Sequence, residues 1–210
     1  CPAACAALQS GGDFLAKRQY DWKFLPYCGI INKIGTLIVP EMIALSGGDT
    51  MRIVEARIEI PMGSQNKYEV DEKTGKIKLD RVLYSAAFYP MEYGFVENTL
   101  SEDGDALDIM VMTSAPTFPG CYIDSVIIGG FDMIDCGQED TKILAVNMGD
   151  PRYAHIKSIE DLPPHTMKEL ENFFSTYKTL QEKETRVLGF FDEAEACKRL
   201  DAAILRYRQR

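Results

Sequence analysis

Residues 54–60 alternate between apolar and polar side chains. Valine, alanine and isoleucine occupy the even positions, and Glu55, Arg57 and Glu59 occupy the odd ones. A period of two predicts a β-strand with one buried face. Residues 66–70 alternate in the same way, and the turn-forming residues 71–75 separate them from a returning stretch at 76–79, which predicts a β-hairpin.

Further short segments predict more strands in the middle of the chain. Residues 109–112 are wholly apolar, residues 88–96 are rich in aromatic side chains, and residues 141–146 predict another strand. The apolar stretch 122–131 is long enough that we expect a pair of strands there. Many short strands separated by turn residues are typical of a small β-barrel.

Two helices are predicted towards the C-terminus. The first begins at Pro163-Pro164, because proline is favoured at the first helical position, and its apolar residues follow at helical spacing: Met167, Leu170, Phe173, Phe174 and Tyr177. The second begins with a capping pair, Asp192 and Glu195, and has an apolar stripe of Ala196, Leu200, Ala203 and Tyr207. Strands followed by helices indicate an α+β fold.

Residues 1–50 form an N-terminal extension to this pattern, which leaves 51–210 as the main domain. Turn-like Ser-Gly-Gly-Asp sequences occur at 10–13 and 46–49, and residues 34–39 predict a strand that ends at Pro40. The extension holds Trp22 and several other aromatic residues and is close to neutral, whereas disordered tails are polar and charged. We therefore expect it to pack, either on its own domain or on a neighbouring subunit.

Composition narrows the range of partners. The 210 residues have a net charge of −9, which argues against binding nucleic acid through its phosphates. No apolar run reaches membrane-spanning length, so no membrane partner is expected.

The six cysteines include no C-x-x-C pair, so we expect reduced thiols that are mostly buried. Reduced thiols indicate a cytoplasmic protein, or a protein of an organelle if a leader has been removed. Two histidines are too few for a histidine-rich zinc or copper site.

The most distinctive stretch is Asp103–Asp108, in which Asp103, Asp105 and Asp108 lie within six residues. Three carboxylates this close repel one another, and a hard divalent cation with oxygen ligands would relieve the repulsion. An EF-hand is excluded, because its twelfth position would be Ser114 instead of glutamate. The alternative is an acidic surface loop, but the apolar residues 109–112 imply that Asp108 enters a buried strand, where an unpaired carboxylate is costly.

Other charged residues could join this cluster. Alternation in a strand places Asp140 and Lys142 on one face, and likewise Lys67 and Glu69. Asp135 precedes Asp140 across a turn-like sequence. Each alone is more simply explained as a surface charge. Together, inside a barrel, they would bind several divalent cations and a strongly anionic ligand, which suits phosphoryl chemistry.

The order of the short motifs resembles the family I soluble inorganic pyrophosphatases. The resemblance extends over residues 52–207 and rests on the motifs at 58–61, 66–69, 80–81, 88–94, 103–108, 135, 139–142, 155–157, 161–163 and 173–178. It implies an OB-type β-barrel of five strands with flanking helices, and Mg²⁺-dependent hydrolysis of pyrophosphate to two orthophosphates. The compact, prokaryotic-like members, which this chain resembles most apart from its N-terminal extension, usually form hexamers.

The resemblance also implies a role for each matching residue. Asp103, Asp108 and Asp140 would hold the magnesium pair that binds the attacking water, and Asp105 would be the general base. Glu59, Glu69 and Asp135 would serve the metals that arrive with substrate. The phosphates would be bound by Lys67, Arg81, Tyr93, Lys142, Tyr177 and Lys178, with Tyr93 also counted as catalytic. Two departures from the family pattern are Ala106, where proline is usual, and Glu184, beside Lys183, where a lysine is common.

Two other functions fit the residues. One is a non-catalytic OB-fold module that binds an anionic ligand such as a nucleic acid or polyphosphate, although such modules need a basic groove. The other is a hydrolase of phosphate esters with the same metal chemistry.

Overall fold

The computed structural model describes residues 42–44, 50–71 and 73–210 of the chain. Nine strands are assigned within these residues: β1 Met42–Ala44, β2 Thr50–Ile60, β3 Asn66–Val70, β4 Ile77–Val82, β5 Glu92–Val96, β6 Leu107–Met112, β7 Tyr122–Asp135, β8 Gln138–Asn147 and β9 Thr185–Asp192. The helices are α1 Pro164–Thr176 and α2 Glu193–Arg208, with short 3-10 turns at Ile159–Asp161 and Thr179–Gln181. The fold is α+β and rich in strands, as the pattern predicted.

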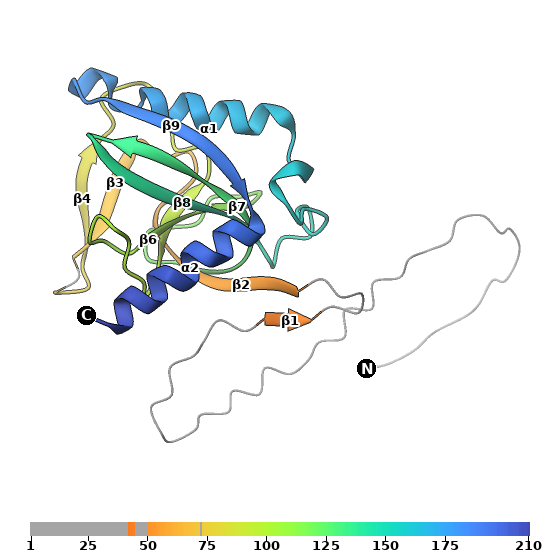
Figure 1. Ribbon diagram of the computed structural model, residues 1–210. Coiled ribbons are helices and arrows are strands. Elements are labelled where there is room, and N and C mark those ends of the chain that lie inside the picture. Colours follow the sequence, from red (N-terminus) through yellow and green to blue (C-terminus); the bar gives the residue numbers. More distant parts are fainter. Residues whose placement is uncertain (1–41, 45–49, 72) are drawn as a thin grey trace, which may run out of the picture. The chain divides into compact units, whose positions relative to one another are not determined.

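The main sheet has the strand order β1-β2-β5-β6-β8-β7-β9. Its strands β8, β7 and β9 are neighbours in Figure 1. A further antiparallel pairing joins β2 to β7, from Ile53 opposite Val126 to Arg57 opposite Tyr122. The hydrogen-bonded pairings therefore run from β2 through β5, β6, β8 and β7 and return to β2. The hairpin of β3 and β4 forms a separate two-stranded sheet, at the position predicted.

The prediction of two strands within residues 122–131 was wrong. These residues belong to the single strand β7 of 14 residues, which continues to Asp135. Gly129 and Gly130 do not form a turn; the register shifts between Ile127 and Gly129, so the strand has an irregularity there and continues. A side chain at Gly129 would lie 2.4 Å from Ile159, which explains the need for glycine in this strand.

Both helices begin at the predicted residues. Pro164 occupies the first helical position of α1, and the Asp192 side chain caps α2 by accepting a hydrogen bond from the Glu195 N–H at 2.9 Å. The apolar stripe of α2 was predicted correctly for Ala196, Leu200 and Ala203, which are buried, but not for Tyr207, which is 40% exposed. Tyr207 lies in the last turn of α2, which ends at Arg208.

Both faces of the central strands are buried. In β6, Met110 belongs to an apolar cluster with Phe174 of α1, whereas Ile109 and Val111 belong to a second cluster with Leu200 of α2. This arrangement explains why residues 109–112 are continuously apolar instead of alternating. It also fixes Asp108, which precedes them, at the edge of a rigid core.

Three further predictions from the sequence concern the cysteines, the strand at 34–39 and membrane-spanning segments. The described cysteines, Cys121, Cys136 and Cys197, are free thiols, but none is fully buried and Cys136 is exposed, contrary to expectation. The strand predicted at 34–39 lies outside the described residues. Among the helices that the structure describes, none is long and apolar enough to cross a membrane.

Candidate active site

A cleft of about 1160 Å³ opens where the β3–β4 hairpin, the ring of paired strands and the end of α1 meet. Every candidate site residue from the sequence lines it: Glu59, Lys67, Glu69, Arg81, Tyr93, Asp103, Asp105, Asp108, Asp135, Asp140, Lys142, Tyr177 and Lys178. A second cavity of about 120 Å³, lined by Met62, Met91 and Leu170 among others, includes none of them. The structure thus brings together residues separated by more than a hundred positions in the chain.

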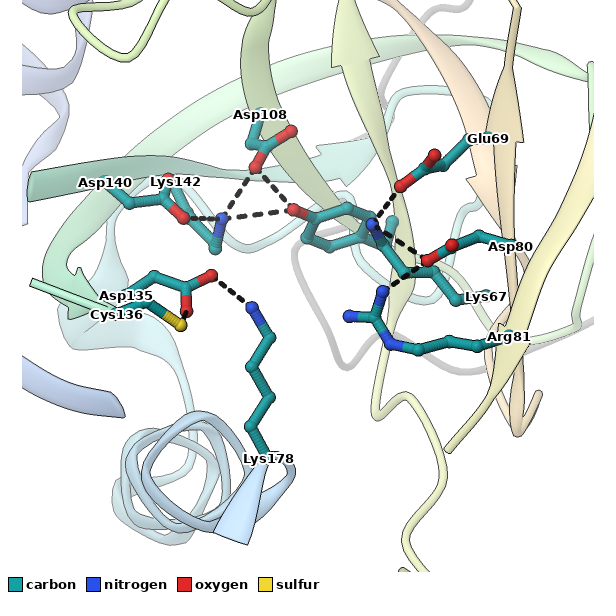
Figure 2. A network of polar contacts seen from close by, with 11 residues as sticks. Lys67, Glu69, Asp80, Arg81, Asp108, Asp135, Cys136, Asp140, Lys142 and Lys178 are labelled. Atoms are coloured by element: carbon teal, nitrogen blue, oxygen red, sulfur yellow. Dashed lines mark hydrogen bonds and ion pairs between the residues drawn. The ribbon is translucent and has the colours of Figure 1, made fainter. Parts of the chain in front are cut away.

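Lys142 lies at the centre of the charged residues in the cleft. Strands β6 and β8 are parallel neighbours with Asp108 opposite Lys142, and Asp140 lies two residues earlier on the same face. The Lys142 Nζ donates hydrogen bonds to Asp108 Oδ2 at 2.6 Å, to Asp140 Oδ2 at 2.7 Å and to Tyr93 Oη at 3.1 Å. The Tyr93 hydroxyl also donates to Asp108. One buried ammonium group therefore joins two carboxylates, as Figure 2 shows.

A second pair lies beside it. Lys178, which follows α1, donates a hydrogen bond to Asp135 at the end of β7 (Figure 2). Cys136 and Gly137 form the turn to β8 with φ angles of 53° and 87°. The thiol of Cys136 donates to the other oxygen of Asp135 at 3.2 Å. No sequence signal marks Cys136 as a site residue, apart from its place directly after the candidate ligand Asp135.

The β3–β4 hairpin supplies a third group of charges. Lys67 pairs with Glu69 on the same face of β3, and Arg81 pairs with its neighbour Asp80. Asp80 also lies 3.8 Å from the Lys67 ammonium group, although the sequence indicated it only as part of a family motif. Glu59 of β2 accepts a hydrogen bond from the Val70 N–H at 2.7 Å, which ties the hairpin to the main sheet.

Asp103 and Asp105 lie in the loop of residues 97–106, between β5 and β6. The Asp103 carboxylate accepts a hydrogen bond from the Asp105 N–H at 3.1 Å, and the Asp105 carbonyl accepts one from the Ser101 N–H at 2.7 Å. Gly104, with φ 98°, allows this tight path. The loop is closed by these bonds although Ala106 stands in place of the usual proline.

The cleft holds more negative charge than its own cations neutralise. Burial, with repulsion from Asp108 and Asp103, raises the pKa of Asp140 to about 6 in spite of Lys142. Burial and the charges of Asp108 and Glu69 raise the pKa of Glu59 to about 7. The pKa of Asp135 behaves differently: burial would raise it, but the hydrogen bonds from Lys178 and Cys136 keep it below its usual value.

Oxygen donors with raised pKa values fit a hard divalent cation, which would stabilise their charged forms. In the part of the chain that the structure describes, no three acidic, histidine or cysteine side chains gather closely enough to hold an ion. The ammonium groups of Lys142 and Lys178 lie against the carboxylates instead. The donor chemistry therefore fits a cation, and the lysines are the groups that would have to share these carboxylates with it.

A sequence model described as inorganic pyrophosphatase matches residues 56–208, which include every candidate site residue. The chain belongs to the inorganic pyrophosphatase family. It is 54% identical over 158 residues to the inorganic pyrophosphatase of Geobacillus stearothermophilus, over 75% of this chain and 96% of that protein. It is 48% identical over 139 residues to soluble inorganic pyrophosphatase 5 of Arabidopsis thaliana, over 66% of this chain and 64% of that one.

Solved structures of pyrophosphatases agree with this assignment. The crystal structure of inorganic pyrophosphatase from Thermus thermophilus has a TM-score of 0.72 and 42% identity, and covers 74% of this chain and 91% of that chain. The pyrophosphatase family match begins at residue 56, so residues 1–50 lie outside it. Neither Lys183 nor Glu184, the second departure from the family pattern, lines the cleft.

Proposed function

We propose that this chain hydrolyses inorganic pyrophosphate to two orthophosphates with Mg²⁺ as the cofactor. The observation that supports this most strongly is the convergence of carboxylates, lysines, an arginine and two tyrosines in a single cleft of a pyrophosphatase-family chain. Pyrophosphate is small and highly charged, so it needs both cations and hydrogen-bond donors around it. Few other ligands would require this mixture.

The family resemblance divides the carboxylates of the cleft into two sets of candidate ligands. Asp103, Asp108 and Asp140 would hold the magnesium pair beside the attacking water, and Glu59, Glu69 and Asp135 would serve the metals that arrive with substrate. Bound magnesium would supply charge neutralisation and a lowered pKa for water.

The residues of the chain perform the remaining steps. Asp105 accepts a proton from the attacking water while the water oxygen bonds to one phosphorus atom of pyrophosphate. The bond between that phosphorus and the bridging oxygen breaks, and the bridging oxygen leaves with the other phosphate. Lys67, Arg81, Lys142 and Lys178 bind phosphate oxygens and stabilise the charge on the leaving group. Burial raises the pKa of Tyr93 and of Tyr177, so both phenols stay protonated and can donate hydrogen bonds.

Three further proposals concern the barrel, the assembly and location of the protein, and residues 1–50. We propose that the ring of pairings among β2, β5, β6, β8 and β7 forms an OB-type barrel of five strands. The protein assembles as a homo-oligomer, most simply a hexamer, in the cytoplasm. Residues 1–50 form an extension that packs on this domain or on a neighbouring subunit.

A phosphate-release assay tests the function directly. Pyrophosphate, ATP and a phosphate monoester are compared with the full chain, with and without millimolar Mg²⁺. We expect rapid release from pyrophosphate with Mg²⁺ only. Preference for the monoester would indicate a phosphate-ester hydrolase, and release from none of the substrates would favour a binding module.

A further inference from the structure

The loop of residues 97–106, here called the acidic loop, holds Asp103 and Asp105 at the edge of the cleft. Its tip is exposed and also includes Glu102, and Asp108 follows within two residues of the loop. Four carboxylates in seven residues repel one another, so the loop has an electrostatic reason to move away from Asp108 and Asp140. Some other contact must hold it in place.

Contacts within the loop fix its shape but not its direction. The buried Thr99 hydroxyl donates to the Val96 carbonyl at 2.5 Å and accepts from the Leu107 N–H at 2.8 Å, which closes the base of the loop. The bond between Ser101 and Asp105 closes the tip. Leu100 lies between the two closures, and it links the loop to helix α2.

Helix α2 binds both backbone polar groups of Leu100. The Leu100 N–H donates to the Ala203 carbonyl at 3.0 Å, and the Leu100 carbonyl accepts from Arg206 Nη1 at 2.8 Å. Arg206 Nη2 also donates to Glu102 Oε1 at 2.9 Å. That ion pair is exposed and adds little on its own, since the Glu102 side chain is 72% accessible. The bond to the Leu100 carbonyl is the stronger tie, because it is also charge-assisted but is partly buried, whereas the ion pair is exposed.

We propose that Arg206 is a positioning residue, which holds the acidic loop against the last turn of α2 and so keeps Asp103 and Asp105 beside the cleft. The inference rests on the proposed function for the roles of those two carboxylates. A positive charge in the last turn of a helix is itself favourable, so Arg206 is compatible with its place in α2. The sequence pattern of α2 gave no indication of this role.

The chain offers matched variants for a test. Arg206→Ala removes the two hydrogen bonds that Arg206 donates to the loop. Arg206→Lys keeps the charge but cannot donate from two nitrogens to two acceptors. Arg208→Ala makes the same charge change at an exposed position of the same helix turn, and Glu102→Gln removes only the exposed ion pair.

Two measurements on the full chain separate positioning from a general structural role. Hydrogen exchange reports the opening of the amides of residues 99–107, and calorimetry reports Mg²⁺ affinity without substrate. For Arg206→Ala we expect about tenfold faster exchange in the loop and about tenfold weaker Mg²⁺ binding, with kcat recovered at saturating Mg²⁺. Arg206→Lys should be intermediate, and Arg208→Ala and Glu102→Gln close to wild type.

Several results would overturn the inference. The first is an Arg206→Ala variant whose loop exchange rate and Mg²⁺ affinity equal those of Arg208→Ala. The second is an Arg206→Ala variant with faster loop exchange but unchanged Mg²⁺ affinity. If Arg206→Ala does not fold, loop exchange and Mg²⁺ affinity are compared between Arg206→Lys and wild type, and equal values for the two proteins overturn the inference. A wild-type chain that releases no phosphate from pyrophosphate would contradict the proposed function alone, because the exchange data would still report whether Arg206 holds the loop.

Discussion

Lys142 balances the charge at the centre of the cleft. Its ammonium group is buried and bonded to Asp108, Asp140 and Tyr93, and the two carboxylates hold its pKa above the usual value although burial alone would lower it. A buried charge of this kind is costly unless it is paired, and the same holds for its partners. Each residue of this cluster therefore depends on the others for its stability as well as for binding phosphate.

Replacing Lys142 should show this dependence. In buffer without metal, Lys142→Met leaves two neighbouring carboxylates unpaired, and we expect the free energy of unfolding to fall by about 3–5 kcal/mol. Added Mg²⁺ should restore part of the loss. Urea unfolding measures it, with Lys198→Met as a control on an exposed pair. A loss no larger than that of Lys198→Met would contradict the account of the charge cluster.

Asp150 predicts a dependence of stability on pH away from the cleft. Hydrogen bonds from the Ser114 hydroxyl and from the backbone N–H groups of Arg152 and Ser114 lower the pKa of Asp150 to about 2. Its stabilising effect is therefore complete above the unfolded pKa near 4 and is lost as the pH falls towards 2. In urea unfolding between pH 7 and pH 3, Asp150→Asn should lose less stability than wild type. Equal slopes for the two proteins would show that Asp150 does not contribute.

At the scale of elements, the close pairing of β2 and β5 positions Glu59 and Tyr93. Gly94 of β5 lies opposite Ile58, and a Cβ atom there would be 1.9 Å from the Arg57 carbonyl oxygen. The two strands can approach this closely only with glycine at position 94.

Gly94→Ala should therefore lower the free energy of unfolding by at least about 2 kcal/mol. The matched control is Gly189→Ala in β9, where an added Cβ meets nothing within 4 Å, so its effect should be small. Thermal unfolding compares the two variants. Similar midpoints for both would mean that the strands separate easily, contrary to the structure.

The sequence predicted most of these elements because their residues follow a single period. Alternation placed Asp140 and Lys142 on one face, and their ion pair confirms it. Alternation does not identify a strand whose buried and exposed residues follow no regular order. The burial of residues along β9 is irregular in this way, and we predicted no strand there. The length of the apolar stretch 122–131 suggested two strands, because only the fold shows that a single strand, β7, continues through Gly129 beside Ile159. Arg206 could not be found, since its partner is a backbone carbonyl 106 residues away.

At the scale of the whole molecule, residues 51–210 and the N-terminal extension differ in charge. The net charge of −9 falls entirely in residues 51–210, where the cleft collects carboxylates that bound cations would neutralise. The family match begins at residue 56, after the extension. We expect the extension to stabilise the protein or its assembly through its aromatic residues.

A chain that begins at Met51 tests this expectation beside the full chain. Sedimentation should show an oligomer for the full chain, and removing residues 1–50 should change the assembly or lower the thermal midpoint. Monomers in both cases would refute the proposed oligomer. Identical assembly and midpoint would show that the extension packs on nothing.

The central claim is that this cleft hydrolyses pyrophosphate with Asp105 as the general base. The most direct measurement is the rate of phosphate release from pyrophosphate in saturating Mg²⁺ by wild type and by Asp105→Asn, with Asp124→Asn at an exposed position as control. We predict a loss of kcat of about 10²–10⁴-fold for Asp105→Asn, with little change for the control. Near-normal turnover by Asp105→Asn, or no turnover by wild type, would contradict the account.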